Sequence, residues 1–202
     1  MVTSEIINLI LTGVTIAIAI IALLQSNKQI SLSNKQCLFK DRARDYVKFN
    51  GLVQLYKNNK KIVEQFAITN PYFVFQILTK DEIFEDDNFF EGKPLSPKEQ
   101  KVFFGLMDDL ETLATEISLL WESNISDLAK KFVYAYFFLL ESLFRHNISI
   151  TTKGKNNGYY EPVLKILTPN KLPDSIKQIE LIYIELENQN ILKQMFEQIK
   201  LK

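Results

Sequence analysis

The chain has 202 residues, enough for one folded domain and a membrane anchor but not for two full domains. Gly and Pro are scarce, at 6 each, and this composition is typical of an all-α protein. The 24 basic residues balance the 24 acidic residues, so the net charge is zero and we expect no nucleic-acid partner. The single cysteine, Cys37, excludes an intramolecular disulfide.

A long uncharged segment lies close to the start of the chain. The nineteen residues from Ile6 to Leu24 carry no charge, and twelve of them are Ile, Leu or Val. A helix of this length matches the hydrocarbon layer of about 30 Å. The twelve aliphatic residues favour insertion by roughly 4 to 7 kcal/mol in total. We therefore predict a transmembrane span over about residues 6–24, within an anchor of residues 1–27.

Two other interpretations of this segment are weaker. A cleavable signal usually has basic residues before its apolar run, but the opening "MVTSE" has none. A buried core helix is the other alternative, and the terminal position of the run disfavours it.

The charges that flank the run predict its orientation. Basic residues follow it and none precedes it, so the positive-inside rule places the N-terminus outside the cell and residues 28–202 in the cytoplasm. With about five residues on the outer side, we expect no ectodomain and no receptor role.

Small and polar residues recur within the span at spacings of four and three. They share one face of the helix, and small residues let membrane helices approach each other closely. This pattern predicts self-association through the anchor. Coincidence is the alternative, because seven of the nineteen residues are small or polar. The predicted contact stripe consists of Asn8, Thr12, Thr15, Ala19 and Ala22.

Helical patterns continue beyond the anchor. Apolar residues recur at helical spacing after Leu38, which predicts that the anchor runs into a first cytoplasmic helix, with a break near residues 26–34. Proline in a first turn and polar capping residues such as Ser96 mark the later helix starts. The sequence predicts an antiparallel helical bundle of about four long helices. The expected later helices are a short one from Pro71, one from Pro97 to about Trp121, one from Ser126 or Asp127 to about Asn147, and one from Pro173 to near Lys202.

Residues 148–160 depart from the helical pattern. Ile148 and Ile150 alternate with polar residues, and Asn157 with Gly158 is a turn dipeptide. These features predict a small hairpin, and a disordered loop is the alternative.

The sequence contains no recognisable catalytic constellation, and we predict no cofactor. His146 is the only histidine, which excludes a His-rich metal site and a two-histidine mechanism. No glycine-rich phosphate loop occurs. An acidic connection is the one candidate for holding a hard cation, and a solvated loop is its alternative. Its acidic residues are Asp81, Glu82, Glu85, Asp86, Asp87 and Glu91.

Aromatic residues cluster between positions 132 and 144. Most of them are expected in the core. A bundle of only four helices does not bury this helix on every side, so part of the cluster is predicted to remain as an apolar partner surface. The candidate residues are Phe132, Tyr136 and Phe137.

The segment "ISLSNKQCLFKDRARDYVKFNGLVQLYKNNKK" resembles the region after the anchor in small, uncharacterised single-span membrane proteins of Gram-positive bacteria. The similarity covers about thirty residues and contains no catalytic motif. Some small membrane proteins with this general architecture act as effectors in phage defence. The analogy rests on the architecture alone. The resemblance transfers no function to particular residues, but the predicted anchor and the lack of a recognisable catalytic constellation lead us to expect a membrane-tethered, non-enzymatic interaction or effector protein. An anchored enzyme that uses the acidic connection and a divalent metal is the alternative.

Overall fold

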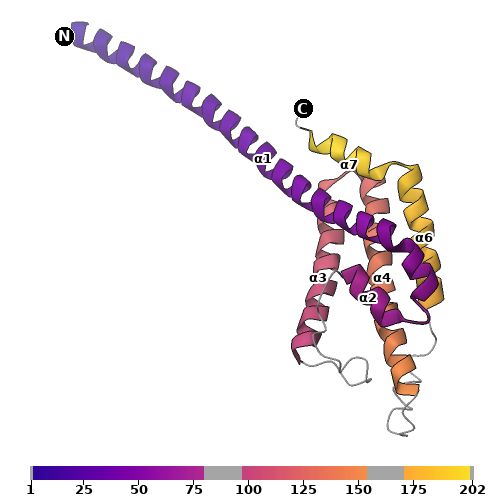
Figure 1. Cartoon of the computed structure of the whole chain (residues 1–202). Coiled ribbons are helices and arrows are strands. Elements are labelled where there is room, and N and C mark those ends of the chain that lie inside the picture. Colours follow the sequence, from indigo (N-terminus) through magenta and orange to yellow (C-terminus); the bar gives the residue numbers. More distant parts are fainter. Residues whose placement is uncertain (1, 80–96, 154–170, 201–202) are drawn as a thin grey trace. The chain divides into compact units, whose positions relative to one another are not determined.

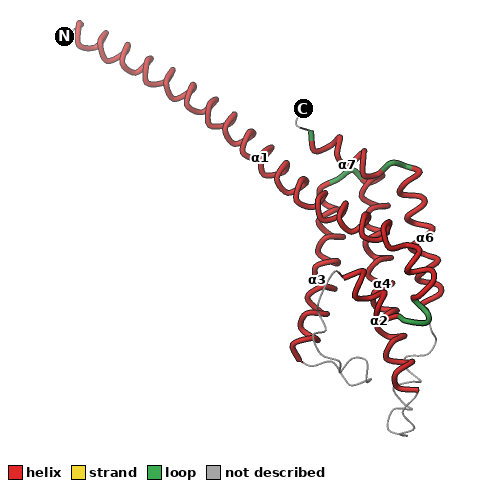
Figure 2. Tube along the Cα trace, in the orientation of Figure 1, coloured by secondary structure: helices red, strands yellow, loops and turns green. Residues whose placement is uncertain are grey.

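The structure, a computed structural model, describes residues 2–79, 97–153 and 171–200. All regular secondary structure in these ranges is helical, which confirms the prediction of an all-α protein. Figure 2 shows the short loops that join the helices. The six helices are α1 (Val2–Phe66), α2 (Pro71–Thr79), α3 (Pro97–Leu120), α4 (Ser123–Lys153), α6 (Leu172–Asn188) and α7 (Ile191–Ile199).

The chain divides into two compact units, Met1–Asp41 and Arg42–Lys202. The first unit consists of the first part of α1. The second unit contains the rest of α1 and the other five described helices, which pack together as a bundle. The boundary predicted from the sequence, after residue 27, lies before this division.

The helix α1 is continuous over 65 residues. The break predicted near residues 26–34 is therefore wrong. The segment "SNKQISLSN" contains neither Gly nor Pro, so nothing in it removes a backbone donor or favours a bend.

The centre of the second unit is α4. Figure 1 shows α4 between α3 and α6, and it packs against both of them. The short helices α2 and α7 also pack against α4. From α1, the rings of Phe49 and Tyr56 each lie 6.0 Å from the ring of Phe132, between centroids. Five helices thus contact α4.

Polar contacts align the end of α1 with α6. Lys57 Nζ lies 3.4 Å from Glu187 Oε1, and one turn further on Lys60 pairs with Glu180. Because the residue numbers rise along α1 while they fall along α6, the two helices run in opposite directions. The Tyr56 hydroxyl donates to Glu180 Oε2 at 3.1 Å. Burial, followed by the charge of Glu180, raises the pKa of this tyrosine.

Prolines set the starts of three helices, as the sequence predicts. α2 begins at Pro71 and α3 at Pro97, while Pro173 stands in the first turn of α6. The missing backbone N–H of proline costs nothing in a first turn, where that donor has no helical acceptor. The predicted cap Ser96 lies outside the described residues.

The last predicted helix is divided into two. α6 ends at Asn188 and α7 begins at Ile191, and Asn190 between them has a φ of 53°. Asn adopts this left-handed conformation at a lower cost than most residues, and its backbone there turns the chain out of the helix. The prediction of one unbroken helix from Pro173 is wrong for this reason.

The hairpin predicted over residues 148–160 is wrong in its first part. α4 continues to Lys153, so residues 148–153 are helical. Ser149 is buried, as is Asn147 just before the alternating pattern begins, which shows that α4 stays against the bundle into this segment. Residues 154–160 lie outside the described residues.

Candidate functional site

The apolar run lies on a helix that is long enough and apolar enough to cross a membrane, by length and composition. The large apolar side chains described between Leu11 and Leu24 are 51–65% exposed. The first unit holds no second described element that would cover them. The prediction of a long apolar helix near the N-terminus is confirmed.

The predicted contact stripe lies on this helix. Thr12, Thr15, Ala19 and Ala22 are exposed, and Asn8 is helical, although its side chain lies outside the described residues. Thr15 Oγ1 donates to the carbonyl oxygen of Leu11 at 2.8 Å. Its hydroxyl proton is therefore used within its own helix, so close approach at the alanines is the stronger basis for a helix contact.

Two residues of the predicted aromatic partner surface are in the core. Phe132 is fully buried and Tyr136 is 1% exposed, so the prediction that they form a surface is wrong. The sequence suggested only four long helices around this position, but the short α2 covers it as well. The Tyr136 hydroxyl donates to the carbonyl oxygen of Leu78 in α2 at 2.6 Å.

Other aromatic residues of α4 do reach the surface. Phe138 is 45% exposed, and Phe137, the third predicted residue, is half-buried against it with ring centroids 5.4 Å apart. One turn earlier, the half-buried ring of Tyr134 lies 5.9 Å from Lys130 Nζ. These residues form a small aromatic strip on α4 with a basic edge.

The residues considered for chemistry do not form a reactive centre in the described part of the chain. His146 Nε2 lies 3.0 Å from the carbonyl oxygen of Ile68, which gives the imidazole a structural hydrogen bond. Cys37 is exposed in the first unit. The acidic connection, residues 81–91, lies outside the described residues. Elsewhere in the described ranges, no group of three or more His, Cys, Asp or Glu residues is placed to hold a metal ion.

Arg42, the first residue of the second unit, binds the ends of two helices. Its Nε donates to the carbonyl oxygen of Leu120 at 2.7 Å, and its Nη1 donates to that of Gln198 at 3.3 Å. Leu120 is the last residue of α3, and Gln198 is in the last turn of α7. Carbonyl groups in the last turn of a helix lack helical donors and carry partial negative charge. A guanidinium supplies both the missing hydrogen bonds and a positive charge.

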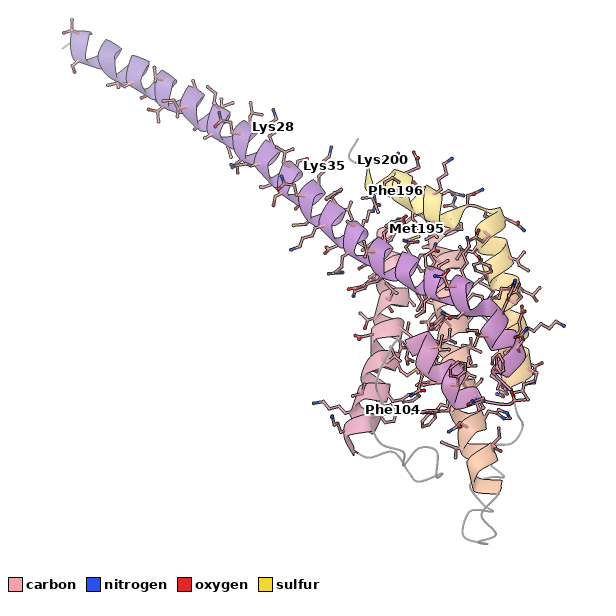
Figure 3. All side chains as sticks on the ribbon, viewed as in Figure 1. Lys28, Lys35, Phe104, Met195, Phe196 and Lys200 are labelled. Atoms are coloured by element: carbon pink, nitrogen blue, oxygen red, sulfur yellow. The ribbon has the colours of Figure 1, made fainter. Side chains whose placement is uncertain are left out.

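The same end of the bundle is closed by α7. Figure 3 labels Met195, Phe196 and Lys200 on this helix. Met195 is fully buried, while Phe196 is 47% exposed and its ring lies 5.8 Å from that of Tyr46 in α1. Lys200 Nζ lies 5.2 Å from the centre of the Phe196 ring.

Replacing Arg42 by alanine is expected to destabilise the second unit. Each lost charge-assisted hydrogen bond costs roughly 1.5 to 3 kcal/mol, and two carbonyl groups lose their donor. Because the bond to Gln198 is long, at 3.3 Å, we expect less than two full bonds, and urea unfolding of the full chain should show a loss of about 2 to 4 kcal/mol. The loss should be smaller for Arg42→Lys, which keeps the charge without the planar guanidinium. Arg145→Ala is the matched control, because Arg145 forms an exposed pair with Glu141 in the same helix, worth about 0.5 kcal/mol. Equal losses for Arg42→Ala and Arg145→Ala would contradict the capping role.

The second arginine of this segment joins two carboxylates. Arg44 Nε donates to Asp45 Oδ1 at 2.9 Å, and Arg44 Nη2 donates to Glu116 Oε1 at 3.0 Å. The Asp45 side chain is completely buried, whereas that of Glu116 is partly exposed. Burial is the main cause that raises the pKa of the Asp45 carboxyl.

This polar cluster, defined by Arg42, Arg44, Asp45 and Glu116, was not predicted from the sequence. One signal was available: the chain has three arginines, and two of them are separated by a single residue. Their partners on α3 and α7 are more than seventy positions away, so helical periodicity cannot reveal them.

Comparison with known proteins finds no relative of this chain. No protein-family model, curated protein or solved structure matches the chain.

Proposed function

We propose that the protein is a membrane-tethered, non-enzymatic interaction or effector protein whose helical domain faces the cytoplasm. The observation that carries this proposal is the continuity of α1, a helix that begins with the exposed apolar run and ends inside the packed core of the second unit. An exposed aliphatic helix of this length is costly in water and stable in a bilayer. The role in interaction is supported by the aromatic strip on α4.

The proposed orientation rests on charge. Lys28 and Lys35, labelled in Figure 3, follow the apolar run, and both are exposed. No basic residue precedes the run. Retention of basic residues on the cytoplasmic side would hold the N-terminus outside.

The single cysteine provides a direct test of this orientation. Cys37 is exposed and follows the apolar run by thirteen positions. A membrane-impermeant maleimide is expected to label it only after the cells are permeabilised. In the matched control, Cys37→Ser with Ser4→Cys, the label is expected to react in intact cells. The opposite pattern would overturn the orientation, and extraction of the full chain by alkaline carbonate would overturn the anchor itself.

We further propose that the anchor self-associates through the stripe that contains Ala19. In a Cys37→Ser background, Ala19→Cys is expected to form an oxidative dimer in membranes. Ala17→Cys is the matched control, since it changes the same residue type about 200° away around the helix. Equal cross-linking at the two positions, or none at Ala19→Cys, would reject the predicted stripe.

A further inference from the structure

The Arg44 guanidinium brings two carboxylates together. The edge formed by Nε and Nη2 usually binds both oxygens of one carboxylate. Here it binds one oxygen of Asp45 and one oxygen of Glu116, at 2.9 and 3.0 Å. Because the two donors of that edge are adjacent and nearly parallel, the two carboxylates that share it are close neighbours.

The second oxygen of each carboxylate is buried and accepts no hydrogen bond in the structure. These atoms are Asp45 Oδ2 and Glu116 Oε2. Two further buried atoms in the described residues have no hydrogen-bond partner, namely Trp121 Nε1 and Gln198 Oε1. Trp121 follows Leu120 in the chain, and Gln198 accepts from Arg42 through its backbone carbonyl, so both residues are at or next to the helix ends that Arg42 binds. Three of the four atoms are acceptors without a donor, namely the two carboxylate oxygens and Gln198 Oε1, whereas Trp121 Nε1 is a donor without an acceptor.

We propose that Asp45 and Glu116 hold one proton between them, and that release of this proton at rising pH loosens the contact between α1 and α3. A protonated carboxyl donates a hydrogen bond and carries no charge, so one proton supplies a donor and removes the like-charge repulsion. Without it, two carboxylates face the single guanidinium that joins them, and the more deeply buried one, Asp45, is left with a charged oxygen that has no partner.

The charges around Asp45 agree with this assignment. Burial raises the pKa of Asp45 most, and the carboxylate of Glu116 from α3 raises it further. Arg44 and Lys48 of α1 lower it, without reversing the direction. On α7, Glu197 pairs with Lys200, the residue that follows the helix, at 3.2 Å, and Gln198 near them is uncharged.

The sign of the pH effect follows from linkage. The folded state binds the Asp45 proton more tightly than the unfolded chain does, so this proton adds stability at low pH. The contribution is complete below the ordinary Asp value of about 3.9 and is lost as the pH rises through the higher pKa of the folded state. A rise in pH through the raised pKa of Asp45 therefore weakens this end of the bundle.

Trp121 makes the proposal measurable, because it is the only tryptophan of the chain and it is 5% exposed next to the cluster. We titrate the full chain in detergent micelles from about pH 4 to about pH 9, a range that includes raised carboxyl pKa values. The Trp121 emission is expected to pass through a transition in the wild type that Asp45→Asn abolishes. Glu116→Gln is expected to move its midpoint down by about one pH unit, because the like charge is gone.

Asp108→Asn, an exposed change on α3, is the matched control and is expected to leave the transition in place. A wild-type titration without a transition, or a transition that survives in Asp45→Asn, overturns the proposal, since a surviving transition would belong to another group. Circular dichroism confirms folding of each variant. If Asp45→Asn does not fold, Glu116→Gln decides, since an unmoved midpoint also overturns the shared proton.

Discussion

The double variant Val14→Lys with Ile18→Lys is expected to release the full chain from the membrane fraction. Both side chains are exposed on the apolar part of α1, at 51% and 61%, and they lie near the middle of the run. A lysine at the centre of a span costs roughly 2.5 to 3.5 kcal/mol on the insertion scale. Two of them cost about 5 to 7 kcal/mol, which equals the whole favourable contribution of the aliphatic residues.

The matched control adds the same charges just beyond the run. Asn27→Lys with Ser31→Lys has the same spacing on exposed positions of α1, and we expect it to leave membrane association intact. Fractionation followed by carbonate extraction measures both variants. Membrane retention of the Val14→Lys and Ile18→Lys protein would show that this segment is not the anchor.

Truncation of Phe132 to alanine is expected to cause the largest loss of stability among single changes in the bundle. Its ring is fully buried and lies 6.0 Å from both Phe49 and Tyr56, in edge-to-face arrangements, and 6.3 Å from Tyr136. A Phe-to-Ala change in a core costs about 3 to 5 kcal/mol, because both burial and aromatic contacts are lost and a cavity is left. Domains are typically stable by about 5 to 15 kcal/mol, so this loss is a large fraction of the total.

Phe138→Ala is the matched control for this change. The two residues have the same side chain on the same helix, but Phe138 is 45% exposed, and we expect a loss of less than about 1.5 kcal/mol. Urea unfolding monitored by Trp121 emission measures both. Similar losses would mean that α4 does not have the burial described for it. If Phe138→Ala instead weakens a protein contact while stability is kept, the aromatic strip on α4 gains direct support as a binding surface.

Local signals in the sequence predicted most of the helices. Proline positions marked the starts of α2, α3 and α6, because the backbone rules that favour proline in a first turn involve only neighbouring residues. The apolar run of α1 was equally visible, since it depends on composition alone. The turn at Asn190 was missed because the apolar residues on both sides of it were taken as one helical pattern, although Asn is a residue that favours helix ends.

The surface of α4 was harder to predict than the helix itself. Phe132 and Phe138 are chemically identical, and which one is exposed depends on where α1 and α2 cross the helix. Helical spacing orders the residues of one helix around its axis, but it does not show which neighbouring helix covers each side. The polar cluster was missed for the same reason. The acceptors of Arg42 are backbone carbonyls of helices that are distant in the sequence, so the spacing within its own helix does not indicate them.

The contact between Arg42 and Gln198 has a consequence for biosynthesis. The two residues are 156 positions apart, yet Arg42 donates to a carbonyl in the last turn of α7, the helix that contains Gln198. Arg42 leaves the ribosomal exit tunnel long before Gln198 is added to the chain. The hydrogen bond between them can therefore form only after α7 has also left the tunnel. In an anchored chain the apolar run has entered the bilayer by then, so the contact between Arg42 and α7 forms only after the anchor is in place.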